Sequence, residues 1–204
     1  MTKNLNQHIP QYCGSCWAHG ALSALADRIK IASAGGVRGS VEINLSIQYI
    51  LNCASDVAGS CHGGSATGTY EFIKKTGYVP YDTCQQYLAC SSESEEGFCG
   101  SVDTTCSPLN TCRTCGTFGS GCSAIDYFPN ASIAEYGTVR GEDDMMAEIY
   151  ARGPIACGVD ATPLHNYTGG IFTGSDEISI NHIISIIGWD EDADGTKFWI
   201  MRNR

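Results

Sequence analysis

The sequence predicts an α+β fold, with helices in the first half of the chain and strands in the second. Apolar residues recur at helical spacing from residue 16 until Gly35 and Gly36 interrupt the pattern. After Pro154, short runs rich in β-branched residues replace that spacing. With 204 residues, of which 43% are hydrophobic, the chain can form one compact domain or two closely packed lobes.

Three helices are expected in the first half. The first covers residues 16–34 and ends at the glycine pair. A second covers 45–51, behind the polar Asn44. A third covers 70–75 and ends at Gly77, a residue type that favours helix ends.

Strands dominate the second half. The acidic residues 142–144 suit the positive end of a helix dipole, so one further helix is expected to begin there. Beyond it, strands are expected at four short apolar runs, namely 155–159, 171–173, 180–187 and 197–201. We therefore expect a helical lobe over about 15–125 and a strand-rich lobe over about 126–204.

The composition narrows the class of protein. Twelve Lys and Arg against 22 Asp and Glu give a net charge of −10, which argues against nucleic acid as a partner. The longest apolar run, 183–189, is too short to span a bilayer, so no membrane association is expected. The pI of about 4.8 suits an acidic, lysosome-like compartment. Twelve cysteines indicate an oxidising secretory route.

The segment around Cys16 carries the strongest chemical signal. Residues 13–17 read Cys-Gly-Ser-Cys-Trp, and the first helix is expected to begin at about Cys16. The positive end of the helix dipole favours thiolate over thiol, and the thiolate is the nucleophile. A neighbouring imidazole would complete this activation. The sequence therefore predicts a nucleophilic cysteine.

Of the five histidines, His182 is the best candidate for this imidazole. It lies in an apolar, β-branched run that predicts a buried strand. An acidic turn at 190–195 follows, and then a second strand that leads to Asn203. Alone, either residue would be read as an ordinary strand or turn residue. Together with Cys16, the order Cys, His, Asn favours a catalytic set.

On these residues the chain resembles the papain-like (C1) cysteine proteases. Three extra residues between Gln7 and Cys13, in a loop that contains His-Ile-Pro, make it similar to the cathepsin X group, also called cathepsin Z. Further matching segments are 84–122, 145–155 and 166–171. The resemblance implies a papain-like two-lobed fold, in which the active-site cleft separates a helical lobe from a β-barrel-like lobe.

The resemblance implies a role for each candidate residue. Cys16 would be the nucleophile, His182 the general acid and base, and Asn203 the residue that orients the imidazole. Gln7 would donate to the oxyanion together with the backbone N–H of Cys16. Gln11 is a rival for this role, because it lies closer to Cys16 in the sequence.

Substrate contacts are implied on both sides of the scissile bond. His8 would hold the C-terminal carboxylate of the peptide, most strongly in acid, and would block longer peptides. An exposed loop histidine without a role is the alternative. Gly63 and Gly64 would let an extended peptide approach the backbone closely, and Trp17 is also expected at the substrate.

The resemblance also implies how most cysteines pair. Four pairs follow the family, and the remaining two cysteines flank the acidic insert 91–96 and are paired with each other. The expected disulfides are Cys13–Cys61, Cys53–Cys106, Cys84–Cys112, Cys90–Cys99 and Cys115–Cys122. Cys16 stays free. The family partner of Cys157 lies near a C-terminus that this chain does not contain.

Three motifs have other interpretations. Cys13 and Cys16 have the spacing of a thioredoxin-like dithiol, but no strand is expected before them. Four cysteines could bind zinc as thiolates, although an oxidising compartment would pair them; they are Cys106, Cys112, Cys115 and Cys122. Residues 190–195 resemble half of an EF-hand loop, but Met201 stands where a glutamate is needed, which favours a hairpin turn. No metal or cofactor is therefore expected.

The expected function is that of a lysosomal-type cysteine carboxypeptidase, which removes single residues from peptides or proteins with a free C-terminus. A lysosomal or secreted location, an inhibitory pro-segment, a monomeric state and glycosylation at Asn130 and Asn166 go with it. No signal peptide follows Met1, and the family pattern continues past Arg204, so we expect the chain to be incomplete at both ends. The alternative is a non-catalytic, disulfide-rich secreted module or an inactive fragment.

Overall fold

The structure is a computed structural model that describes residues 1–34, 42–174 and 178–203. Gly35 and Gly36, which were expected to end the first helix, lie outside the described residues. Within the described ranges, no helix is both long enough and apolar enough to cross a membrane.

The four expected helices and the strands expected at 155–159, 180–187 and 197–201 are present in the expected order, with additional short helices and strands between them. The helices are α1 (Cys16–Ala34), α2 (Ile47–Cys53), α3 (Ala66–Thr76), η1 (Cys99–Ser101), α4 (Pro108–Thr111), α5 (Glu142–Arg152) and η2 (Thr162–Asn166). The strands are β1 (Gly59–Ser60), β2 (Gly63–Gly64), β3 (Val79–Pro80), β4 (Arg113–Cys115), β5 (Cys122–Ala124), β6 (Asn130–Ala131), β7 (Ile155–Val159), β8 (His182–Glu191) and β9 (Lys197–Arg202).

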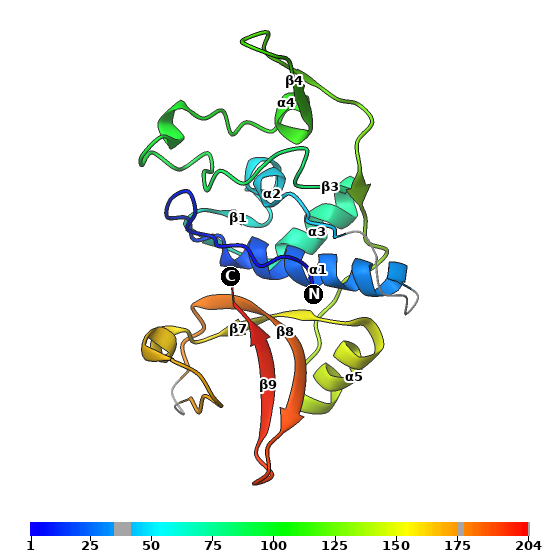
Figure 1. The fold of residues 1–204 in the computed structure, drawn as a ribbon, viewed down its shortest axis with the longest axis vertical. Coiled ribbons are helices and arrows are strands. Elements are labelled where there is room, and N and C mark those ends of the chain that lie inside the picture. Colours follow the sequence, from blue (N-terminus) through cyan, green and yellow to red (C-terminus); the bar gives the residue numbers. More distant parts are fainter. Residues whose placement is uncertain (35–41, 175–177, 204) are drawn as a thin grey trace.

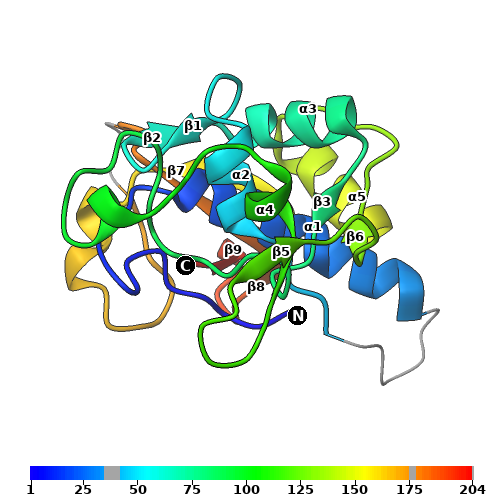
Figure 2. The same cartoon turned by 90° about the horizontal axis from the view of Figure 1, so that it is seen from above.

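Helix α1 lies between the two parts of the molecule. Figure 1 shows α2 and α3 on one side of it and the sheet of β7, β8 and β9 on the other, and Figure 2 shows α2 against α1 from above. Trp17, Leu22 and Leu25 of α1 are buried in the main hydrophobic cluster with Ile50 and Ile73. Removing this apolar surface from water fixes the position of α1.

Local signals set the ends of the shorter helices. The hydroxyl of Ser46 accepts a hydrogen bond from the backbone N–H of Tyr49 at 3.1 Å and so caps the start of α2. Helix α3 begins earlier than expected, at Ala66, and ends at Gly77 as expected. Gly77 has a φ of 86°, a left-handed conformation that glycine adopts without a steric penalty.

Strands β7, β8 and β9 form one antiparallel sheet, in that order. One face packs against α5, where Ile149 joins Ile184 and Ile186 in a second hydrophobic cluster. The other face lies against α1 at Gly20. A Cβ at Gly20 would lie 2.8 Å from a side-chain carbon of Ile183, so glycine is what permits this close approach of helix and sheet.

Beyond Pro154 the described residues contain one three-stranded sheet, so the expected β-barrel-like lobe is not confirmed. One other expectation about this region was wrong. Residues 171–173 form no strand, because no neighbouring described strand pairs with them. Between β8 and β9, residues 192–196 form the expected hairpin turn, in which the Asp192 carboxylate accepts from the backbone N–H groups of Asp194 and Thr196.

The structure contains five disulfides, and they are the five pairs expected from the sequence: Cys13–Cys61, Cys53–Cys106, Cys84–Cys112, Cys90–Cys99 and Cys115–Cys122. Cys16 and Cys157 are free thiols. Because Cys13 bonds to Cys61, it forms no dithiol with Cys16. The four cysteines considered as a zinc site are all in disulfides, so they offer no thiolates.

Candidate active site

Cys16 is the first residue of α1, as the sequence predicted. Burial alone would raise the pKa of its thiol. The hydrogen bond with the His182 side chain, backbone hydrogen bonds from Ile183 and Trp17 and the charge of His182 outweigh this effect and lower the pKa of Cys16. A thiolate is therefore favoured at the start of the helix.

His182 is the first residue of β8, and Asn203 follows the end of β9. The Nε2–H of His182 donates to Oδ1 of Asn203 at 2.6 Å, which leaves Nδ1 for the hydrogen bond with Cys16. The hydrogen bond with Cys16 is the main cause that raises the pKa of His182, burial opposes it, and the contact with Asn203 adds to it. The two opposite pKa shifts favour an imidazolium beside a thiolate.

The residue before the histidine anchors the start of β8. The side chain of Asn181 accepts from the backbone N–H of Ala161 at 2.9 Å and donates to the hydroxyl of Thr162 at 2.8 Å. It also donates to the Asp160 carboxylate at 3.2 Å. These contacts join the end of β7 to the start of β8, next to His182.

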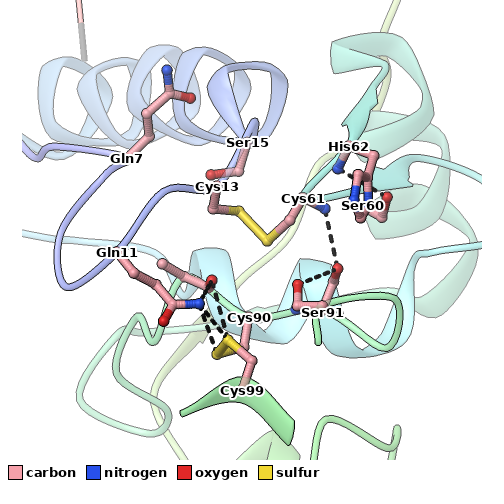
Figure 3. Close-up of a disulfide and its surroundings, with 12 residues drawn as sticks. Gln7, Gln11, Cys13, Ser15, Ser60, Cys61, His62, Cys90, Ser91 and Cys99 are labelled. Atoms are coloured by element: carbon pink, nitrogen blue, oxygen red, sulfur yellow. Dashed lines mark hydrogen bonds between the residues drawn. A yellow bond between two sulfur atoms is a disulfide. The ribbon is translucent and has the colours of Figure 1, made fainter. Parts of the chain in front are cut away.

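Gln7 and Gln11, the two oxyanion candidates, point away from each other (Figure 3). Nε2 of Gln11 lies 2.6 Å from the sulfur of Cys99 and 3.4 Å from the carbonyl oxygen of Glu96. The Gln11 side chain is thus engaged at the Cys90–Cys99 disulfide, whereas the Gln7 side chain is buried and points away from that disulfide. This arrangement favours Gln7.

His8 lies in an exposed loop before Cys13. Its ring stacks on Tyr12, with centroids 4.7 Å apart, and its Nδ1 accepts from the backbone N–H of Cys13 at 3.4 Å. Nε2 of His8 lies 3.4 Å from Nε2 of Gln7. The structure therefore places the expected carboxylate-binding ring beside the expected oxyanion donor.

Gly63 and Gly64 are exposed and form β2 next to the Cys13–Cys61 disulfide. A Cβ at Gly64 would lie 2.3 Å from the carbonyl oxygen of Ala58 and 2.5 Å from the Trp17 ring. Trp17 itself is fully buried, and its indole N–H donates to the carbonyl oxygen of Ser60 at 3.1 Å. The expectation that Trp17 contacts substrate was wrong, because the ring packs beneath β2 instead.

A cavity of about 440 Å³ lies away from these residues, where α1, α3, α5 and β7 meet. Free Cys157 contributes to its wall, and burial raises the pKa of this thiol. Cys157 therefore lacks the environment that favours a thiolate at Cys16.

The residues expected to carry glycans lie on the surface. Asn130 in β6 and Asn166 at the end of η2 are both exposed. In the ranges that the structure describes, no three His, Cys, Asp or Glu side chains cluster as metal ligands would.

Sequence reasoning missed several residues that support the site. Tyr87 contacts the residue before Cys16, and Arg202 forms a buried ion pair with Asp27 of α1. Each contact joins residues far apart in the chain, so no local motif pointed to it. The polar Asp27 within the apolar pattern of 16–34 was the one available signal.

Comparisons with known proteins agree with this geometry. A model of the papain family cysteine proteases matches residues 2–204. Cathepsin Z of Onchocerca volvulus is 42% identical over 200 residues, which are 97% of this chain and 59% of that protein. Fruit bromelain of Ananas comosus is 31% identical over 193 residues, covering 94% of this chain and 45% of that protein. The chain thus spans 59% or less of the length of these relatives.

Solved structures share the fold. The bromelain protease from Ananas comosus, in complex with the E64 inhibitor, matches with a TM-score of 0.70 and 28% identity over 99% of this chain and 77% of that chain. The ragweed pollen cysteine protease Amb a 11, in its proform, matches with a TM-score of 0.69 and 22% identity over 99% of this chain and 46% of that chain. The papain-like fold expected from the sequence is confirmed.

Proposed function

Because the chain belongs to the papain family of cysteine proteases, we propose that it cleaves peptide bonds with Cys16 as the nucleophile and His182 as the general acid and base. The observation that carries this proposal is the line of contacts from Cys16 through His182 to Asn203. It supplies a thiolate, a proton donor and a side chain that orients the donor.

In the proposed reaction the Cys16 thiolate attacks the carbonyl carbon, and the carbonyl oxygen becomes an oxyanion. The Gln7 amide and the backbone N–H of Cys16 donate to this oxygen. The His182 imidazolium then gives its proton to the leaving amine, and the acyl group remains as a thioester on Cys16. Neutral His182 takes a proton from water, and the resulting hydroxide attacks the thioester to release the acid and the Cys16 thiolate.

The finer part of the proposal is carboxypeptidase specificity. Since His8 lies beside Gln7, a peptide whose carbonyl oxygen contacts Gln7 would bring a terminal carboxylate, one residue further on, toward the His8 ring. Because Nδ1 of His8 accepts from the backbone N–H of Cys13, its Nε2–H can donate to that carboxylate, and the ring would leave no path for a longer chain. The similarity to cathepsin Z of Onchocerca volvulus supports this specificity.

The proposed partners follow from the same chemistry. Substrates are peptides or proteins with a free C-terminus, and a pro-segment inhibits the precursor, as the proform of the ragweed protease suggests. Five disulfides support folding in the secretory pathway and a lysosomal or secreted location.

A peptide with a free C-terminus and its amidated counterpart test the proposal, with products identified by mass spectrometry. We expect the free peptide to lose single C-terminal residues and the amidated one to resist. Cys16→Ser should abolish cleavage, while Cys157→Ser, at the other free thiol, should retain it. Cleavage by Cys16→Ser overturns the mechanism. Equal cleavage of both peptides overturns the carboxypeptidase assignment, and an inert wild-type chain favours the non-catalytic alternative.

A further inference from the structure

The geometry points to Tyr87 as a positioning residue that ties Gln7 to the start of α1 and so holds the oxyanion donor in place. The inference rests on the proposed function, because it concerns the role of Gln7 in that reaction. Tyr87 does not contact the substrate in this role and acts through Gln7.

The central contact is a short hydrogen bond between two segments far apart in the chain. The phenol of Tyr87 donates to the backbone carbonyl oxygen of Gln7 at 2.6 Å. The same phenol oxygen lies 2.7 Å from the hydroxyl of Ser15, the residue before Cys16. Because the single phenol proton goes to Gln7, the Ser15 hydroxyl must donate to Tyr87.

This pair of contacts continues into the helix that carries the nucleophile. Nδ1 of His19 lies 3.0 Å from the carbonyl oxygen of Ser15 and 3.2 Å from its hydroxyl, so the ring donates from Nδ1. The rings of His19 and Tyr87 also meet edge to face, with centroids 4.9 Å apart. The donors run in one direction, from His19 to Ser15 to Tyr87 to Gln7.

The environment keeps these contacts intact. Ser15 and His19 are fully buried and Gln7 is 8% exposed, so water competes little for their polar groups. Burial raises the pKa of Tyr87 to about 12, and the phenol therefore remains a donor from acid to weakly alkaline solution. A loss of activity caused by removing the phenol should not depend on pH in that range.

Tyr87 is itself held by its neighbours in the chain. The backbone N–H of Leu88 donates to the Gln48 side chain at 2.9 Å, and the amide of Gln48 donates to the carbonyl oxygen of Cys90 at 2.7 Å. Gln48 belongs to α2 and is fully buried. The loop around Tyr87 is therefore fastened to a rigid element, which is what a positioning role requires.

Gln7 needs such a tie because it lies in an irregular segment that no strand supports. Among the described residues, its side-chain Nε2 has one polar neighbour, Nε2 of His8, at the long distance of 3.4 Å. A donor that moves by about 1 Å from the oxyanion can lose much of its effect, on the order of 100-fold in rate. The 2.6 Å bond to Tyr87 restrains the Gln7 backbone against such a shift.

Tyr87→Phe removes only the phenol hydroxyl, keeps the ring and is the decisive variant. We expect kcat for a free-acid peptide to fall about 10- to 100-fold, with KM and the melting temperature little changed. The rate of alkylation of Cys16 at about pH 5 should stay at the wild-type value, because alkylation needs the thiolate and forms no oxyanion. Combined with Gln7→Ala, the loss should be smaller than the product of the two single losses.

Tyr70→Phe is the matched control, because the Tyr70 phenol also donates to a backbone carbonyl of the chain, that of Ala21 in α1, at 2.9 Å. It should leave kcat unchanged. Should Tyr87→Phe fail to fold, Ser15→Ala removes the hydrogen bond between Ser15 and Tyr87 and should lower kcat in the same way.

Wild-type kcat in Tyr87→Phe, or a loss that multiplies fully with that of Gln7→Ala, overturns the inference while the proposed reaction stands. A wild-type chain whose Cys16 resists alkylation overturns both. The two outcomes can be told apart, because the alkylation rate depends on the Cys16 thiolate, whereas kcat depends in addition on stabilisation of the oxyanion.

Discussion

Asp27 of α1 and Arg202 of β9 form a buried ion pair, in which Oδ2 and Nη2 are 2.8 Å apart and the side chains are 2% and 9% exposed. The backbone of Thr2 contacts both members of the pair, since its N–H donates to Asp27 and its carbonyl oxygen accepts from Arg202. Arg202 directly precedes Asn203. The pair therefore joins the helix that begins with Cys16 to the strand end that holds His182 through Asn203.

Asp27→Ala should destabilise the fold, because it leaves the Arg202 charge buried without its partner. We expect a loss of about 3–5 kcal/mol in the free energy of unfolding, measured by urea denaturation. Glu148→Ala is the control, since its ion pair with Arg28 is also 2.8 Å long but more exposed, and should cost about 0–1 kcal/mol. Equal losses in the two variants would contradict the structural role of the buried pair.

His182→Ala should remove the reactivity of Cys16 toward alkylating agents at acidic pH. His182 lowers the pKa of Cys16 against the effect of burial, so the thiolate persists at pH values below the ordinary thiol range. The contact with Cys16 raises the pKa of His182, so the imidazolium persists at pH values above the ordinary imidazole range. The ion pair occupies the window between these two limits. Alkylation at about pH 5, located by mass spectrometry, should be fast in wild type and slow in the variant. Unchanged labelling would show that His182 does not activate Cys16.

His8→Ala should weaken selection for a free C-terminus. Its exposed ring stacks on Tyr12 and makes two long contacts of 3.4 Å, with the backbone N–H of Cys13 and with Nε2 of Gln7, so the fold should keep most of its stability. The ratio of kcat/KM for free over amidated peptide should fall about tenfold or more, a difference of about 1.4 kcal/mol. Tyr12→Ala, which removes the stacked ring, should lower the ratio less. A ratio that His8→Ala leaves at the wild-type value would assign the carboxylate contact to another residue.

Gly64→Ala should destabilise the fold, because the new Cβ would overlap the carbonyl oxygen of Ala58 and the buried Trp17 ring. We expect a cost of about 1–3 kcal/mol, seen as a lower melting temperature. Gly100→Ala places its Cβ no nearer than 3.9 Å to another group and should change stability by less than about 0.5 kcal/mol. Similar melting temperatures for the two variants would mean that β2 can shift away from Trp17.

The sequence predicted elements whose signals are local. Helix α1 matches the expected 16–34, because apolar spacing and a polar helix start act within a few turns. Strand β7 matches 155–159 for the same reason. The contact of His182 with Asn203 was anticipated from a family pattern, and the hairpin between β8 and β9 brings the two side chains together.

The errors and omissions concern contacts between distant segments. Trp17 was expected at the substrate because it adjoins Cys16, but a large ring at that point of α1 fills the space beneath Gly64. The strand expected at 171–173 had a suitable sequence and lacks a described partner strand. The contacts made by Tyr87 and Arg202 depend on segments brought together only in the folded chain.

The sulfur atoms of Cys13 and Cys16 lie three positions apart in the chain and have opposite redox requirements. In the proposed reaction Cys16 must stay reduced to attack a carbonyl, whereas Cys13 must stay oxidised to hold the loop before α1 against the segment that leads to Gly63. Burial separates the two, because Cys13 is fully buried and Cys61 is 6% exposed, while Cys16 is only half-buried. Thiol reductants reach disulfides through solvent. A mild reducing buffer should therefore regenerate an oxidised Cys16 and leave the Cys13–Cys61 bond closed.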